Sequence, residues 1–329
     1  MKLIQLIVFG VATAAAASDG PGRLLVANKG DQALEIVDSN SEKQIATVAE
    51  GGVTGHEVIA SKDGKTAYVP IYGNSGVGKP GTDGQTMAVI DIESHKVTST
   101  VDFGKGVRPH CPLIGPKDGL LYVSTELLQS ITVIDPKTLK VVGSVPTGQN
   151  ESHMFTISHD GKRAYTANVG PGTVSVLDLV NRKVITIIPI SPQTQRISMS
   201  VDGKWVFTSD QTKPRLAVID TKTNKVEKWV ELPDTGYGTA ATPDGKFLVV
   251  AVPKANKVAI VDLHTWKVVK TIEVPKAPQE SLVRPDGKMA YVSCDASGKV
   301  AAIRTSDWTV ETMIDAGKGA DGLAWASAR

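Results

Sequence analysis

Three histidines recur at comparable positions in successive parts of the sequence and could bind a transition metal. They lie in the short segments GHE, RPHC and ESH, at His56, His110 and His153. Neutral imidazole nitrogens are common ligands of zinc and copper. Their spacing is that of a long repeat and not of a compact metal motif such as HExxH. Two interpretations stay open: a metal site, or polar residues that hydrogen-bond to one another, to backbone or to water.

Charged and polar residues near these histidines could bind a small ligand or take part in a reaction. Arginine can hold an anion or stabilise an oxyanion, and a histidine or carboxylate can activate water. The candidates for catalysis are His110, His153, Arg196 and Glu280. The candidates for ligand binding are Glu57, Arg108, Glu126, Arg196, Tyr237, Gln279 and Glu280. The structural alternative is an arginine that only pairs with a neighbouring carboxylate.

The elements that would position these residues belong to a repeat. Its first marker is an Asp-Gly turn, and from Asp118 onward these turns are 42 residues apart. Its second marker is an apolar stretch that ends on aspartate, as in VSVLD at Asp178. The seventh copy of this stretch, VAAIR, ends on Arg304 instead. Repeats of about 42 residues built from strands are typical of β-propeller blades.

Residues 152–188 show one complete unit. Alternation predicts strands over residues 154–158, 163–167, 173–178 and 183–188, with a tight hairpin at Asp160-Gly161. Residues 22–49 supply only the second to fourth strands of a unit, and residues 321–327 supply a single strand. The sequence therefore predicts an all-β, seven-bladed β-propeller with four antiparallel strands per blade. The C-terminal strand would join the N-terminal blade and close the ring.

The strand sequences AYVPIYGN, LYVSTELL, AYTANVGP and AYVSCDAS resemble the YVTN repeat family of β-propellers. The resemblance covers essentially all of the chain after the N-terminal segment. It implies a propeller fold but not a function, because related propellers include surface proteins, heme-binding reductase domains and lactonases. The function we expect is binding of a small polar ligand or a metal at the top of the central channel. The alternative is a hydrolase of the propeller lactonase type that uses histidine, glutamate and arginine at the channel mouth, so enzymatic activity stays open. The sequence contains no CxxCH motif, so we do not expect covalent heme attachment.

Strand direction predicts where the candidate residues meet. The first strands of the blades line the channel, so the residues that open these strands gather at its top entrance. The second blade carries an insertion at residues 72–86, YGNSGVGKPGTDGQT, on the same face. Its glycine content indicates either a lid over the channel mouth or a tolerated surface insertion.

The first 17 residues have the pattern of a secretory signal peptide. A positive start and an apolar run precede small residues at 15–17. We expect residues 18–329 to form a single propeller domain that is periplasmic or secreted, with no later stretch able to span a membrane.

Composition limits the classes of partner. The formal net charge is +2 and no basic run is present, so we expect no nucleic-acid binding. The two cysteines, Cys111 and Cys294, fall on different blades and are expected to be free thiols. We expect a monomer that binds a small molecule or metal ion, and another exported protein is a further candidate partner.

Overall fold

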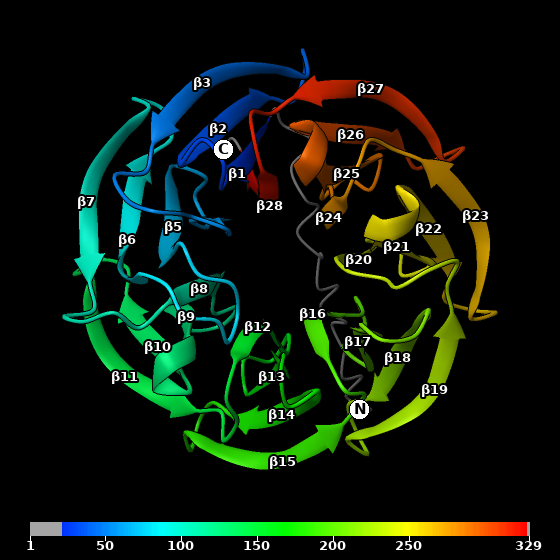
Figure 1. Ribbon diagram of the computed structural model, residues 1–329, viewed down its shortest axis with the longest axis horizontal. Helices are drawn as coiled ribbons and strands as arrows, with labels where there is room; N and C mark the ends of the chain where they lie inside the picture. The colour runs from blue at the N-terminus through cyan, green and yellow to red at the C-terminus, as the bar shows by residue number, and fades with distance from the viewer. Residues whose placement is uncertain (1–21, 328–329) are drawn as a thin grey trace, which may run out of the picture.

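The protein is a ring of seven four-stranded antiparallel sheets around a central axis, as Figure 1 shows. The computed structural model describes residues 22–327 of the 329-residue sequence. The predicted all-β, seven-bladed propeller is confirmed. The predicted signal peptide, residues 1–17, lies outside the described residues.

Each blade begins with the strand nearest the axis and ends with the strand on the outer rim (Figure 1). Blades 1 to 4, from inner to outer strand, have the following bounds: β28 (Ala320–Ser327), β1 (Gly22–Asn28), β2 (Ala33–Asp38) and β3 (Lys43–Ala49); β4 (Ile59–Ala60), β5 (Thr66–Gly73), β6 (Asp83–Asp91) and β7 (Lys96–Asp102); β8 (Pro109–Ile114), β9 (Leu121–Thr125), β10 (Ser130–Asp135) and β11 (Lys140–Pro146); β12 (Ser152–Ile157), β13 (Arg163–Asn168), β14 (Thr173–Asp178) and β15 (Lys183–Pro189).

Blades 5 to 7 follow the same order, and short 3-10 turns follow the second strands of three blades. Their bounds are β16 (Thr194–Met199), β17 (Trp205–Asp210), β18 (Arg215–Asp220) and β19 (Lys225–Glu231); β20 (Thr239–Ala241), β21 (Phe247–Val252), β22 (Lys257–Asp262) and β23 (Lys267–Glu273); β24 (Pro278–Val283), β25 (Met289–Cys294), β26 (Lys299–Arg304) and β27 (Thr309–Asp315); and the turns η1 (Glu126–Leu128), η2 (Pro253–Ala255) and η3 (Asp295–Ser297). None of the described helices is long and apolar enough to cross a membrane.

The Asp-Gly turns fold the first strand of each repeat unit back on the second. In all six of these turns the glycine has a φ between 70° and 72°, a conformation that side chains disfavour. The preceding aspartate accepts a hydrogen bond from the backbone two residues on, as Lys162 N donates to Asp160 Oδ1 at 3.0 Å. This turn chemistry explains why the repeat is visible in the sequence.

The ring closes between the two ends of the described chain. β28 pairs with β1, with Leu25 opposite Ala324, while β1 pairs with β2 on its other side. The predicted closure by the C-terminal strand is therefore confirmed.

The core lies between the blades because the two middle strands of each blade are buried on both faces. β14, for example, buries Val174, Ser175, Val176 and Leu177, whereas the rim strands are largely exposed. Neighbouring blades also pack through aromatic side chains: the ring of Trp266, in the turn before β23, meets that of Trp205, at the start of β17, edge to face at 5.5 Å. The blades therefore stabilise one another by burial of apolar surface.

Two predicted boundaries need correction. The first strand of the fourth blade begins at Ser152, two residues before the predicted start, so His153 lies inside β12. The connection in blade 2 is residues 74–82 and not 72–86, because β5 and β6 continue to pair up to Gly73 opposite Asp83. The glycine-rich sequence concealed these additional pairs.

Replacement of Leu25 by alanine tests the closing blade. Leu25 is fully buried in β1, so we expect the free energy of unfolding to fall by about 2–5 kcal/mol in a denaturant titration. Val141→Ala is the control, because Val141 is 50% exposed and should change this free energy by less than about 0.5 kcal/mol. Equal losses in both variants would contradict the assigned core.

Candidate functional site

The three predicted histidines lie together at the inner ends of blades 2, 3 and 4. His56 precedes β4, His110 is in β8 and His153 is in β12. The ring centroids of His110 and His153 are 3.6 Å apart, and those of His56 and His110 are 5.4 Å apart. The side chain of Tyr72, at the end of β5, is within 6 Å of all three, with centroid distances of 5.1, 5.2 and 5.8 Å. We call these four residues the histidine cluster.

Local backbone structure brings the three histidines to this place. Gly55 bridges to Ile71 of β5, and its N–H also donates to Glu50 Oε2 at 2.8 Å, which fixes the segment before His56. His110 and His153 lie in the first strands of adjacent blades, and Ser124 Oγ on β9 donates to the His153 carbonyl at 2.6 Å. The repeat geometry therefore places equivalent side chains next to one another.

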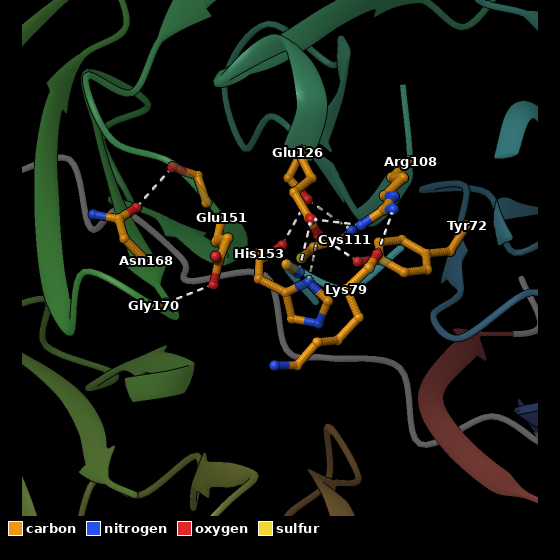
Figure 2. A network of polar contacts seen from close by, with 12 residues as sticks. Tyr72, Lys79, Arg108, Cys111, Glu126, Glu151, His153, Asn168 and Gly170 are labelled. Atoms are coloured by element: carbon orange, nitrogen blue, oxygen red, sulfur yellow. Dashed lines mark hydrogen bonds and ion pairs between the residues drawn. The ribbon is translucent and has the colours of Figure 1, made fainter. Parts of the chain in front are cut away.

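A buried carboxylate joins the histidine cluster to its surroundings, as Figure 2 shows. Glu126 accepts a short hydrogen bond from the Tyr72 hydroxyl and pairs with Arg108 Nη1 at 3.2 Å. Its Oε2 lies 3.8 Å from Nδ1 of His153, which is close for an electrostatic contact but too long for a hydrogen bond. Glu126 is 3% exposed and Arg108 is 5% exposed, so this pair is shielded from water.

Burial sets the protonation state of the cluster. It lowers the pKa of His56 to about 4 and lowers the pKa values of His110 and His153 as well, although Glu126 opposes the shift at His153. Burial alone would raise the pKa of Glu126, but the contacts with His153 and Tyr72 outweigh it and lower that pKa. At neutral pH the neutral imidazoles of the cluster therefore lie beside the ionised carboxylate of Glu126.

The three histidines do not have the arrangement that the predicted zinc or copper site would require. Among residues 22–327, no group of three or more His, Cys, Asp or Glu side chains is placed to hold a metal ion. The rings of His110 and His153 lie face to face with a tilt of 31° and a centroid distance of 3.6 Å. The zinc or copper assignment of His56, His110 and His153 therefore has no support in this geometry.

A second cluster is centred on the predicted residue Arg196 of β16. Its Nη1 contacts Glu57 Oε1 at 2.6 Å and also contacts Glu280, while Nη2 contacts Asp321 Oδ1 at 2.7 Å. These carboxylates come from blades 2, 7 and 1. The guanidinium also lies 5.1 Å from the ring centroid of Tyr237 in blade 6. We call Arg196 and its three carboxylates the arginine clamp, since it joins residues from four blades.

The pKa values of the carboxyl groups in the clamp shift in different directions. Burial raises the pKa of Glu57 well above its usual range and also raises that of Glu280, against the opposing effect of Arg196. Asp321 differs because Arg196 and Lys29 outweigh burial and lower its pKa. Lys29 Nζ is 3.1 Å from both Asp321 and Asp295. The clamp therefore places Asp321, whose pKa is lowered, beside Glu57, whose pKa is raised.

Other residues singled out in the sequence have mainly structural contacts. Gln279 Nε2 donates to the Ala277 carbonyl at 3.4 Å and lies outside both clusters. Cys111 and Cys294 are free and buried, as expected, and the Cys111 thiol faces the Phe155 carbonyl at 3.8 Å. Asn168 binds hydroxyl groups of its own blade, such as Ser152 Oγ at 2.7 Å.

Two members of the site were missed by sequence reasoning. Tyr72 was counted as the start of an insertion, although the continued alternation of YVPIY would have kept it in the strand. Lys29 follows β1 in the blade that closes the ring, so its contact with Asp321 joins sequence positions at opposite ends of the chain. No local pattern could have revealed that pair.

Comparison with known proteins identifies a family and similar folds. Residues 115–326 match the family model described as the cytochrome D1 heme domain. A chain of hydrazine synthase from Kuenenia stuttgartiensis is 21% identical with a TM-score of 0.70, covering 91% of this chain and 99% of that one. A protein of unknown function from Desulfotomaculum acetoxidans is 12% identical with a TM-score of 0.77, covering 93% and 99%. No curated protein sequence matches. The results support a propeller family without identifying the YVTN repeats.

Replacement of Arg196 by methionine should strongly destabilise the protein. It would leave three buried carboxyl groups without their shared partner, so we expect a loss of about 3–5 kcal/mol in the free energy of unfolding at neutral pH. Arg215→Met is the matched control, since Arg215 forms a single ion pair among residues 22–327, with Asp210, lies over the Trp229 ring, and has a side chain that is 28% exposed. A denaturant titration that finds equal losses would show that the clamp has no special role.

Replacement of Glu50 by glutamine should stabilise the protein at alkaline pH. Burial raises the pKa of Glu50 to about 7, so the folded state holds its proton more tightly than the unfolded chain does. The wild type therefore loses stability as pH rises from about 4.5 to about 7, and glutamine avoids this loss. We expect the two proteins to be equally stable near pH 4.5 and the variant to gain at most about 3 kcal/mol above pH 7. Denaturant titrations across this range would contradict the account if the difference did not change with pH.

Proposed function

Because the chain belongs to the cytochrome D1 heme domain family, we propose that it binds a heme-type iron tetrapyrrole beside its histidine cluster. The family match spans blades 4 to 7 and most of blade 3, together with the closing strand. Binding would be non-covalent, in keeping with the lack of a CxxCH motif.

The observation that carries this proposal is the state of His110. Its side chain is 1% exposed, and neither ring nitrogen has a hydrogen-bond partner among the described residues. Burial and the neighbouring His153 and His56 lower its pKa, so the imidazole is neutral. A neutral imidazole with an available nitrogen is the form that coordinates iron.

Residues around His110 would orient the imidazoles for the heme-type group. Such a group supplies an iron centre that can bind a small molecule or exchange an electron. Glu126 would orient His153 through Nδ1, because a carboxylate beside a ring N–H favours one tautomer. Arg108 would hold the Glu126 carboxylate in place through their ion pair, and the Tyr72 ring would pack against all three imidazoles.

The geometry favours binding over the hydrolase alternative. An oxyanion would need free donors from Arg196, but Nη1 and Nη2 already contact Glu57, Glu280 and Asp321, and only the buried Nε has no partner among residues 22–327. Lactone hydrolysis by His110, His153, Arg196 and Glu280 would therefore require the clamp to open. The remaining ligand-binding candidates, Tyr237 and Gln279, would contribute only to the wall of the channel mouth beside the arginine clamp.

Export is part of the same proposal and is supported by the sequence of residues 1–17. An exported propeller would meet its ligand, and any exported partner protein, outside the cytoplasm. Residues 18–329 would then act as one binding domain.

A hemin titration of the purified protein tests the proposed function. We expect saturable, stoichiometric binding with a shifted Soret band, because a histidine would coordinate the iron. His110→Ala should weaken binding by at least about tenfold, and His153→Ala or Glu126→Gln should change the Soret position.

His159→Ala is the control, because His159 lies in the turn after β12 and contacts the Ser200 carbonyl. It should bind hemin as the wild type does. Circular dichroism would verify that each variant is folded. Unsaturable binding, or equal affinity in a His56→Ala, His110→Ala, His153→Ala triple variant, would refute the proposal.

A further inference from the structure

A cavity of about 410 Å³ lies between the 74–82 connection of blade 2 and the tops of blades 3 and 4. Its size is within the range of pockets for small molecules. Its lining includes the Arg108–Glu126 ion pair that lies beside the histidine cluster. Four further charged or polar residues also line it: Lys79, Gln129, Asn150 and Glu151. We call this space the loop cavity.

The wall contributed by the 74–82 connection is fixed to blade 3. Arg108 donates from Nη2 to the Lys79 carbonyl and from Nε to Asp83, each at 2.7 Å. The Gly78 N–H points to Glu126 Oε1 at 3.3 Å. Figure 2 shows Lys79, Arg108 and Glu126 side by side in this network. Because Arg108 and Glu126 are buried, the loop cavity is preorganised and does not need to form when a ligand arrives.

The opposite wall holds a carboxylate in a fixed position. Glu151 Oε2 accepts the N–H of Gly170 at 2.8 Å, a contact drawn in Figure 2. A Cβ at Gly170 would be 2.6 Å from that oxygen, and a Cβ at Gly78 would be 2.4 Å from Oε1. Only glycine fits at these two positions without displacing the carboxylate.

The charges of the loop cavity point to the class of ligand. Arg108 and Glu126 neutralise each other as an ion pair. Lys79 and Glu151 remain, with opposite charges, and no ion pair joins them among residues 22–327. The amides of Gln129 and Asn150 add hydrogen-bonding groups. We propose that the loop cavity binds a small aminocarboxylate, with its carboxylate at Lys79 and its ammonium group at Glu151.

The loop cavity shares Arg108 and Glu126 with the surroundings of the histidine cluster, but its proposed ligand does not depend on heme, so binding can be tested in protein to which no hemin has been added. Isothermal titration calorimetry would use glycine, β-alanine, γ-aminobutyrate and longer ω-amino acids, with carboxylic acids and amines of matched length. We expect at least one aminocarboxylate to bind and its singly charged counterparts to bind at least about tenfold more weakly, because each would lose a charged contact. The preferred chain length would report the distance between the two charged groups.

Lys79→Met and Glu151→Gln should each weaken that binding by at least about tenfold. Lys254→Met is the matched control, since Lys254 lies in η2, the blade 6 counterpart of η1, and should leave binding unchanged. Lys79 is exposed, so its variant should fold even if the Glu151 variant does not. The proposal is overturned if no aminocarboxylate binds, if singly charged compounds bind equally well, or if Lys79→Met binds as the wild type does.

Discussion

The contact on which the channel mouth depends is the arginine clamp. Arg196 of blade 5 contacts Glu57, Glu280 and Asp321, which belong to three other blades. Packing between the blades involves neighbours, whereas this guanidinium ties residues that are distant around the ring. Removal of these charges from water is costly, so the clamp is stable only because the cationic side chains of Arg196 and Lys29 are paired with several carboxyl groups.

The clamp divides the mouth into two chemically different halves. On the side of blades 5, 6, 7 and 1, Nη1 and Nη2 of Arg196 and Nζ of Lys29 already contact carboxylates. On the side of blades 2, 3 and 4, burial keeps the imidazoles neutral and leaves His110 without a partner in the described part of the chain. The second half is therefore where a new ligand gains most from binding, since an unpaired buried polar group is costly.

The fold could be predicted nearly completely because its turns are periodic in the sequence. Asp160-Gly161 and its counterparts mark each blade, and the partial units at the two ends imply the closing pair of β1 and β28. The meeting of the three histidines also followed from their shared place in the repeat. Tyr72 and Lys29 could not be foreseen, because their contacts depend on how far two strands pair and on which side chains reach across blades. The stacking of His110 on His153 likewise depends on side-chain packing, which the repeat does not encode.

The central claim is that the histidine cluster is neutral and available to a ligand. Nitrogen-15 NMR of labelled imidazoles in the folded protein tests it most directly, with assignments from single histidine variants. We predict that His56 and His110 are neutral near pH 6, that His153 titrates below the usual pKa of histidine, and that the signals of His110 and His153 shift when hemin is added. Protonated His56 and His110 near pH 6, or signals that hemin does not change, would contradict the account.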